Sequence, residues 1–179
     1  MKLSILICTM PSRSEMLKKL TQQLMLLLVK YDESQWEVLI QPDENINVGC
    51  KRNILLQKAS VDFVVFIDDD DEIHDNYIDA FMNAIESNPD ADCIGYRGYI
   101  TFDGSSRKDW VISKECETWH EKDGVYYRTP NHISPVKRKI ALKVMFPNIE
   151  FGEDYEYSVG ILPLLKNEVF IDEQLYHYK

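Results

Sequence analysis

The stretch Phe63–Ile73, FVVFIDDDDEI, joins an unbroken apolar run to four aspartates and a glutamate. An apolar run bounded by charge is typical of a strand that is buried on both faces of a parallel sheet. Like charges this close together repel one another unless a positive charge lies among them. The stretch therefore predicts a core strand that brings carboxylates to one end of a sheet, where a cation neutralises them.

Strands and helices alternate on both sides of this stretch. The first helix begins at Ser12–Glu15, which has capping-box spacing. A β–α order of this kind predicts an α/β fold, with a mainly parallel central sheet, helices on both faces, and ligands at the carboxyl ends of the strands. The pattern predicts strands at 2–8, 36–41, 61–68 and 91–96, and helices at 14–30, 48–60 and 76–87.

The second half of the chain has a less regular pattern. Two strands are expected around the turn-rich segment 103–106, and a polar, aromatic loop is expected at 119–134. Helices are expected at 135–145 and 152–165, the second bent or ended near Pro163. A short last strand at 168–172 would precede the final residues.

Composition narrows the classes of function. The chain has 179 residues, which suits one domain, and its net charge of −10 argues against nucleic acid and anionic membrane surfaces as partners. The four cysteines form no CxxC pair, which favours a reducing compartment. No apolar run is long enough for a signal peptide or an integral membrane segment, so we expect a cytoplasmic protein.

Asp68 and Asp70 are the first candidates for chemistry. Side chains alternate along a strand, so these two are expected to point one way and Asp69 the other. Two oxygen ligands on one side suit Mg²⁺ or Mn²⁺, whereas the alternative is a solvated acidic loop. The chain has neither GxxxxGK[ST] nor GxGxxG, so a bound nucleotide would need a metal at its phosphates.

Two carboxylates, Glu153 and Asp154, follow Gly152 at the start of a predicted helix. A helix N-terminus stabilises ionised carboxylates, and a carboxylate in a cleft can take a proton from an attacking hydroxyl. The ordinary acidity of a helix start is an equally supported interpretation.

Four more polar residues have both a binding and a structural interpretation. Arg52 could meet a phosphate or lie exposed on its helix, and Asp43 could bind a base N–H or form a turn. His132 could line an acceptor pocket, although a structural role in its loop is favoured. His177 could complete a metal site or lie in a frayed tail.

Taken in order, four segments resemble the family 2-like glycosyltransferases of the GT-A fold. They are LSILICTMPSR at 3–13, VGCKRN at 48–53, VVFIDDDDEI at 64–73 and FGEDYEYS at 151–158. The third is similar to the DxD-type signature of the family, and the fourth to its later Glu-Asp motif. The resemblance implies a single GT-A (Rossmann-like) domain over 1–179, with the nucleotide-sugar half at about 1–100 and the acceptor and catalytic half at about 101–179.

The resemblance also implies a role for individual residues in a metal-dependent, inverting transfer from a UDP- or GDP-sugar to a saccharide or other hydroxyl acceptor. Asp154 would be the general base, with Glu153 beside it binding the acceptor. The metal ion, Mn²⁺ or Mg²⁺, would be held by Asp68, Asp70 and His177. The nucleotide sugar would be contacted by Thr9, Pro11, Arg13, Asp43, Arg52 and Asp69, with Asp43 recognising the base.

Two other functions remain open at this point. Asp68 could be the nucleophile of an aspartyl-phosphate phosphohydrolase, although Glu72 stands where such enzymes have Thr or Val. The domain could also bind a nucleotide or sugar without catalysis. The loop Pro42–Asn45 lacks the Asp-Gly-Ser that is often seen in the family, which leaves recognition of the base open.

Overall fold

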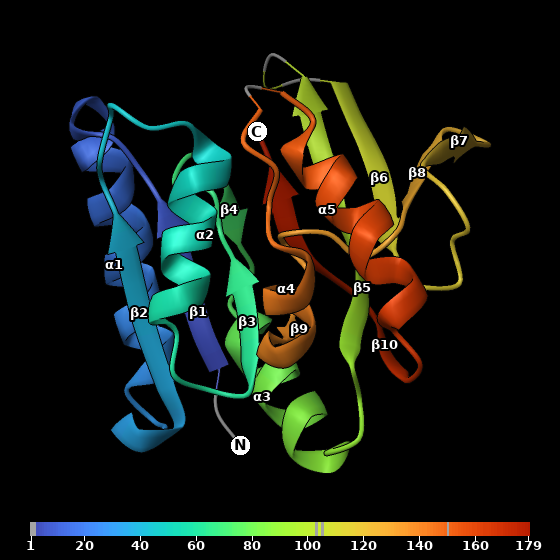
Figure 1. Cartoon of the computed structure of the whole chain (residues 1–179), viewed down its shortest axis with the longest axis horizontal. Coiled ribbons are helices and arrows are strands. Elements are labelled where there is room, and N and C mark those ends of the chain that lie inside the picture. The colour runs from blue at the N-terminus through green and yellow to red at the C-terminus, as the bar shows by residue number, and fades with distance from the viewer. Residues whose placement is uncertain (1–2, 103, 105, 150) are drawn as a thin grey trace.

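One mixed sheet runs through the molecule, with helices on both of its faces (Figure 1). The computed structural model describes residues 3–102, 104, 106–149 and 151–179. The helices are α1 Ser14–Leu28, α2 Val48–Lys58, α3 Tyr77–Ser87, α4 Arg138–Val144 and α5 Glu153–Ile161, with short 3₁₀ turns η1 Pro11–Arg13, η2 Glu33–Gln35 and η3 Leu162–Leu164. The strands are β1 Leu3–Cys8, β2 Trp36–Gln41, β3 Phe63–Phe66, β4 Glu72–Ile73, β5 Cys93–Phe102, β6 Ser106–Ile112, β7 His120–Lys122, β8 Val125–Arg128, β9 Val136–Lys137 and β10 Glu168–Tyr178.

The first half of the sheet is parallel, as the sequence predicts. β1 lies between β2 and β3, and Leu3 is in register with both Trp36 and Phe63. All residues of β3 are buried, which is why its sequence is apolar without alternation. Because the three strands run the same way, their carboxyl ends meet at one edge of the sheet. The predicted strand residue Lys2 lies outside the described residues.

Two apolar layers hold the helices on the sheet. On one face, α1 and α3 pack on β1 and β3, and the leucines 20, 24 and 28 of α1 are buried there. On the other face, α2 and α4 pack on the same strands, and α5 packs against α4 and lies over β5, as Figure 1 shows. The predicted fold class, an α/β fold with a mainly parallel central sheet flanked by helices, is confirmed.

The expected succession of parallel strands is interrupted at the centre of the sheet. β9, only two residues long, lies between β3 and β5 and is antiparallel to both. Its Val136 is 1% exposed and pairs with Val64 and Cys93. The helix predicted from residue 135 therefore begins only at Arg138, because the residues before it complete the sheet.

The end of the chain is an integral strand, so the expectation of a short last strand and a frayed tail was wrong. β10 runs parallel to β5 and antiparallel to β4, and Leu175 and Tyr176 are buried. The expected loop at 119–134 also contains regular structure, since β7 and β8 form a hairpin through Asp123 and Gly124, which both have positive φ. In the predicted turn 103–106, residues 103 and 105 lie outside the described part of the chain.

Candidate functional site

The aspartates after β3 lie in a tight turn at the carboxyl edge of the sheet. β3 ends at Phe66, and the backbone N–H of Asp71 donates to the carbonyl of Asp68 at 3.2 Å. The strand geometry on which the predicted alternation of side chains depends has therefore already ended. Consequently, Asp68 to Asp71 each have different surroundings, and they must be considered one at a time.

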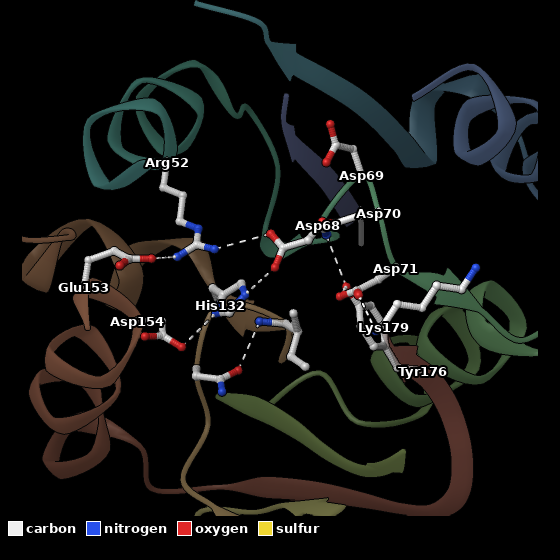
Figure 2. A network of polar contacts seen from close by, with 12 residues as sticks. Arg52, Asp68, Asp69, Asp70, Asp71, His132, Glu153, Asp154, Tyr176 and Lys179 are labelled. Carbon is white, nitrogen blue, oxygen red and sulfur yellow. Dashed lines mark hydrogen bonds and ion pairs between the residues drawn. The ribbon is translucent and has the colours of Figure 1, made fainter. Parts of the chain in front are cut away.

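Asp68 lies between two basic side chains (Figure 2). Its Oδ1 is 3.3 Å from Nη2 of Arg52, and its Oδ2 is 3.2 Å from Nε2 of His132. Burial raises the pKa of this carboxyl, but the adjoining charges and hydrogen bonds of His132 and Arg52 outweigh it, so the pKa lies below its usual range. The first of the four carboxylates is thus held ionised by the protein itself.

Asp69 and Asp70 share the guanidinium of Arg13. Nη1 of Arg13 is 2.8 Å from Oδ1 of Asp69 and 3.0 Å from Oδ2 of Asp70, and the Thr9 hydroxyl donates to Asp69 at 2.6 Å. Asp69 is buried, whereas the side chain of Asp70 is 39% exposed. The prediction that Asp69 points away while Asp68 and Asp70 point together was therefore wrong, because the turn brings Asp69 and Asp70 to the same cation.

Asp71 has a structural environment. Its carboxyl accepts hydrogen bonds from the Tyr176 hydroxyl at 2.7 Å and from the backbone N–H of Lys179 at 2.9 Å. Burial and the nearby Asp68 raise its pKa to about 8. The Tyr176 hydroxyl also accepts a hydrogen bond from the backbone N–H of Asp68 at 3.1 Å. Tyr176 of β10 thus bonds to both ends of the acidic turn, Asp68 and Asp71.

Arg52 connects the acidic turn to α5. Its side chain is 4% exposed and forms an ion pair with Glu153, and its guanidinium lies 5.7 Å from the Phe66 ring and 5.4 Å from the Phe146 ring. The interpretation of Arg52 as an exposed helix charge was therefore wrong. Glu153 is buried and paired with Arg52, so a contact with an acceptor would require its carboxylate to bind the acceptor and Arg52 at the same time.

Asp154 faces the site from the first turn of α5. The preceding Gly152 has φ 80°, a left-handed conformation that favours glycine and sets the direction in which the helix begins. The helix N-terminus stabilises the negative charge of Asp154. Its Oδ2 lies 3.8 Å from Nδ1 of His132, so the His132 ring stands between Asp68 and Asp154 (Figure 2).

Two of the predicted nucleotide contacts are exposed residues. Pro11 is exposed as the first residue of η1. Asp43 is exposed, and its Oδ1 accepts from the backbone N–H of Asn45 at 2.9 Å, as a turn-forming aspartate does. The roles of both residues in binding a nucleotide stay predictions.

His177 is not brought together with Asp68 and Asp70. Its Nδ1 is 3.3 Å from Glu72, its Nε2 is 2.8 Å from the Thr101 hydroxyl, and its ring stacks on Tyr99. Among the described residues, no group of three or more His, Cys, Asp or Glu side chains has a geometry that could hold a metal ion. Its predicted role as third ligand therefore gains no geometric support.

One residue of the site was not identified from the sequence, and another was named there with a structural role favoured. Lys51 is buried and its Nζ donates to the carbonyl of Thr9 at 2.7 Å, which ties α2 to the loop after β1. His132 was favoured as a structural loop residue, although it contacts Asp68 and faces Asp154. A lone histidine carries no periodic or motif signal, so the sequence named both interpretations of His132 and its contacts with the site come from the structure.

In the described part of the chain, no helix has the length and apolar character needed to cross a membrane.

The family model for glycosyl transferase family 2 matches residues 14–147. A Haemophilus influenzae protein named "uncharacterized glycosyltransferase" is 26% identical over 130 residues, which cover 73% of this chain. The chain spans about half the length of that curated relative, 51%.

Solved structures match the fold over the whole chain. The crystal structure of residues 1–349 of TarS from Staphylococcus aureus superposes with a TM-score of 0.74 at 16% identity, covering 100% of this chain and 60% of that one. The complex of the same protein with UDP-GlcNAc gives the same TM-score and covers 99% and 58%. At this identity the likeness establishes the GT-A fold alone. The match of the family model over most of the sequence establishes the family, and this chain belongs to glycosyl transferase family 2.

Proposed function

We propose that this domain transfers a sugar from a nucleotide-diphosphate sugar to a hydroxyl group of an acceptor, with inversion at the anomeric carbon. Membership of the family and the shared fold support a glycosyltransferase. The observation that carries the assignment is the juxtaposition of Asp68, at the carboxyl end of β3, with Asp154, at the start of α5, across the ring of His132. A donor-side carboxylate and a candidate general base thereby face one site.

The proposed reaction needs one base and no covalent enzyme intermediate. Asp154 takes the proton of the acceptor hydroxyl as its oxygen forms a bond to the anomeric carbon. The bond from that carbon to the diphosphate oxygen breaks on the opposite face, and the nucleoside diphosphate leaves with the bonding electrons. The 24% exposure of the Asp154 side chain leaves the carboxylate accessible to a substrate.

A divalent cation that is shared with the substrate would have to draw Asp68 and Asp70 together, because the turn directs Asp68 to Arg52 and Asp70 to Arg13. Asp70 is 39% exposed, and the carboxylates of Asp68 and Asp70 are the hard oxygen donors that Mn²⁺ and Mg²⁺ prefer. Two carboxylates do not close a coordination shell, so the diphosphate oxygens of the donor would supply further ligands. A bound ion would act as a Lewis acid that stabilises the charge of the departing diphosphate.

The loop after β1 and the turn after β3 form the proposed nucleotide edge. Thr9 and Arg13 already contact Asp69, and Arg13 offers a guanidinium for phosphate or base. Asp43, Pro11 and Arg52 complete the set that we assign to the donor. The titration with UDP and GDP described below distinguishes uracil from guanine as the base of the donor.

Calorimetric titration with UDP and GDP, with and without Mn²⁺ or Mg²⁺, tests the donor side. We expect one nucleotide to bind more tightly with metal, and Asp70→Ala to remove that enhancement. Asp75→Ala, an exposed aspartate a few residues later, is the matched control and should leave the enhancement unchanged. Nucleotide binding that is indifferent both to metal and to Asp70→Ala would contradict metal dependence.

Release of the nucleoside diphosphate from a panel of UDP- and GDP-sugars tests the chemistry. We expect Asp154→Asn to retain nucleotide affinity and to lower turnover by at least about 10²-fold, since the general base is lost. Binding without turnover for every donor and acceptor would favour a silent binding domain. Trapping by beryllium fluoride together with phosphatase activity would favour the phosphohydrolase.

The four cysteines are free, which supports a cytoplasmic site for the reaction.

A further inference from the structure

Beside Asp154 lies a small cavity that none of the assigned donor contacts uses. It is lined by Trp110, Arg128, Asn131, His132, Asp154 and Tyr178, with isoleucine side chains completing its wall. Its volume is about 40 Å³. That is room for a few water-sized groups, so it fits one edge of a ligand and not a whole sugar ring.

Two residues that line this cavity each have a buried polar atom without a hydrogen-bond partner among the described residues. These atoms are Nδ2 of Asn131, whose residue is 1% exposed, and Nδ1 of His132, whose residue is 6% exposed. Such groups are rare, because leaving a buried donor or acceptor unpaired costs free energy. Both residues come from the same loop, adjacent in sequence, and face the same cavity.

The orientation of each group is fixed by its other polar atom. Oδ1 of Asn131 accepts from the backbone N–H of Ile133 at 3.1 Å, which directs Nδ2 away from that contact. Nε2 of His132 is held by Asp68 at 3.2 Å, which directs Nδ1 toward Asp154. The distance of 3.8 Å between Nδ1 and Oδ2 of Asp154 is too long for a hydrogen bond.

An oxygen atom about 2.8 Å from both Nδ1 and Oδ2 would close this gap. A hydroxyl is the group that fits when both ring nitrogens of His132 carry a proton: Nε2–H donates to Asp68, Nδ1–H donates to the hydroxyl oxygen, and the hydroxyl donates to the carboxylate of Asp154. The free amide N–H of Asn131 would then bind an oxygen next to that hydroxyl. Trp110 supplies an apolar wall for the carbon atoms between them.

We propose that Asn131 and His132 form an acceptor subsite that binds two neighbouring hydroxyl groups of a saccharide. The reacting hydroxyl lies between Nδ1 of His132 and Asp154, and its neighbour accepts a hydrogen bond from Nδ2 of Asn131. His132 thereby has two separate tasks, since its Nε2 orients Asp68 on the donor side. The inference rests on the proposed glycosyl transfer and names the acceptor class for it.

Two amide substitutions separate the tasks of the two ring nitrogens. The longer side chain of His132→Gln places its amide near the position of Nε2, so the contact with Asp68 is kept and the group facing Asp154 is lost. His132→Asn places its amide near Nδ1 and loses the contact with Asp68. Asn131→Asp keeps the acceptor for Ile133 and removes the free N–H. His120→Gln, the same change at an exposed histidine of β7, is the matched control.

The assay measures the Kd of UDP or GDP by calorimetry, and the kcat and KM of transfer to methyl glycosides of glucose, galactose, mannose and N-acetylglucosamine. For His132→Gln we expect an unchanged nucleotide Kd and a loss of about 10- to 100-fold in kcat/KM for the acceptor, from one lost hydrogen bond to a charged site. For Asn131→Asp we expect a raised acceptor KM with the nucleotide Kd unchanged. For His132→Asn we expect the nucleotide Kd to rise and the acceptor KM to change less.

If the wild type transfers sugar and both His132→Gln and Asn131→Asp have the same acceptor KM and kcat as the wild type, the subsite is overturned. The proposed function then stays intact. The same holds if His132→Gln weakens nucleotide binding as much as it weakens transfer. If His132→Gln fails to fold, an unchanged acceptor KM in Asn131→Asp overturns the subsite by itself. A wild-type protein that neither binds a nucleotide nor releases one from any sugar donor would overturn the proposed function, and the subsite with it.

Discussion

Replacing Asp71 by Asn should stabilise the protein at neutral pH and remove part of its pH dependence. Asp71 is buried, and its pKa in the folded state is raised from 3.8 to about 8 by burial and by Asp68. A carboxyl whose folded pKa exceeds its unfolded pKa favours folding less as the pH rises between the two values. Asparagine has the shape of the neutral acid: its Oδ1 keeps an acceptor for the Lys179 N–H, and its Nδ2, like the O–H of the neutral acid, can donate to the Tyr176 hydroxyl oxygen.

The size of the effect follows from the pKa difference. Each pH unit between the two pKa values costs about 1.4 kcal/mol of folding free energy. Between the unfolded pKa and pH 7 the cost is therefore about 4 kcal/mol as an upper bound, and water penetration around the turn would reduce it. Carboxyl groups with a lowered pKa, such as Glu72 with a pKa of about 2, change the unfolding free energy only below about pH 5. They therefore do not mask the effect of Asp71 between pH 5 and pH 7.

Urea denaturation followed by tryptophan fluorescence at pH 5, 6 and 7 measures the effect. The difference in unfolding free energy between Asp71→Asn and the wild type should grow with pH, from at most about 1.6 kcal/mol at pH 5 to at most about 4 kcal/mol at pH 7. Asp75→Asn, exposed in the same segment, should show no such growth. A difference that stays constant over the three pH values would refute the reasoning, because it would mean that Asp71 ionises in the folded protein as it does in the unfolded chain.

Three further substitutions test other parts of the structure. Arg52→Met should destabilise the protein by about 3–5 kcal/mol in urea denaturation, because it leaves Glu153 buried without its partner, and a loss below about 1 kcal/mol would contradict the buried pair. His177→Ala should leave the effect of Mn²⁺ on nucleotide affinity unchanged, since both ring nitrogens have protein partners; loss of the effect would make His177 a metal ligand. Gly98→Ala should lower the thermal midpoint by several degrees or prevent folding, because a Cβ there would overlap the Trp110 indole, and an unchanged midpoint would contradict the close packing of β5 on β6.

The first hundred residues were predictable because their signals are local. The apolar strands 3–8, 36–41 and 63–66 and the leucine stripe of α1 each follow from a periodicity within a few residues. The two-residue strand β9 has no such signal, and neither has the part of β10 beyond the predicted strand at 168–172. β9 pairs with the backbones of β3 and β5, and β10 pairs with those of β5 and β4, so both strands depend on tertiary structure.

The candidate site shows the same division. Asp68, Glu153 and Asp154 could be named as candidate site residues from the order of motifs along the chain, and their roles stay predictions. Which cation each carboxylate meets could not, because the strand ends before the aspartates and the turn sends Asp68 to Arg52 while Asp69 and Asp70 meet at one guanidinium.

The sequence by itself determined that carboxylates gather at the end of a buried strand, since apolar periodicity and strand direction are local properties of the chain. Only the tertiary structure decided how their charge is neutralised. Arg52 comes from α2 and Arg13 from the loop after β1, whereas His132 comes from a segment about sixty residues after Asp68. The packing of the helices and of β9 sets the distances from these side chains to the carboxylates. Electrostatic interactions depend on distance and burial, and neither can be obtained from residue order.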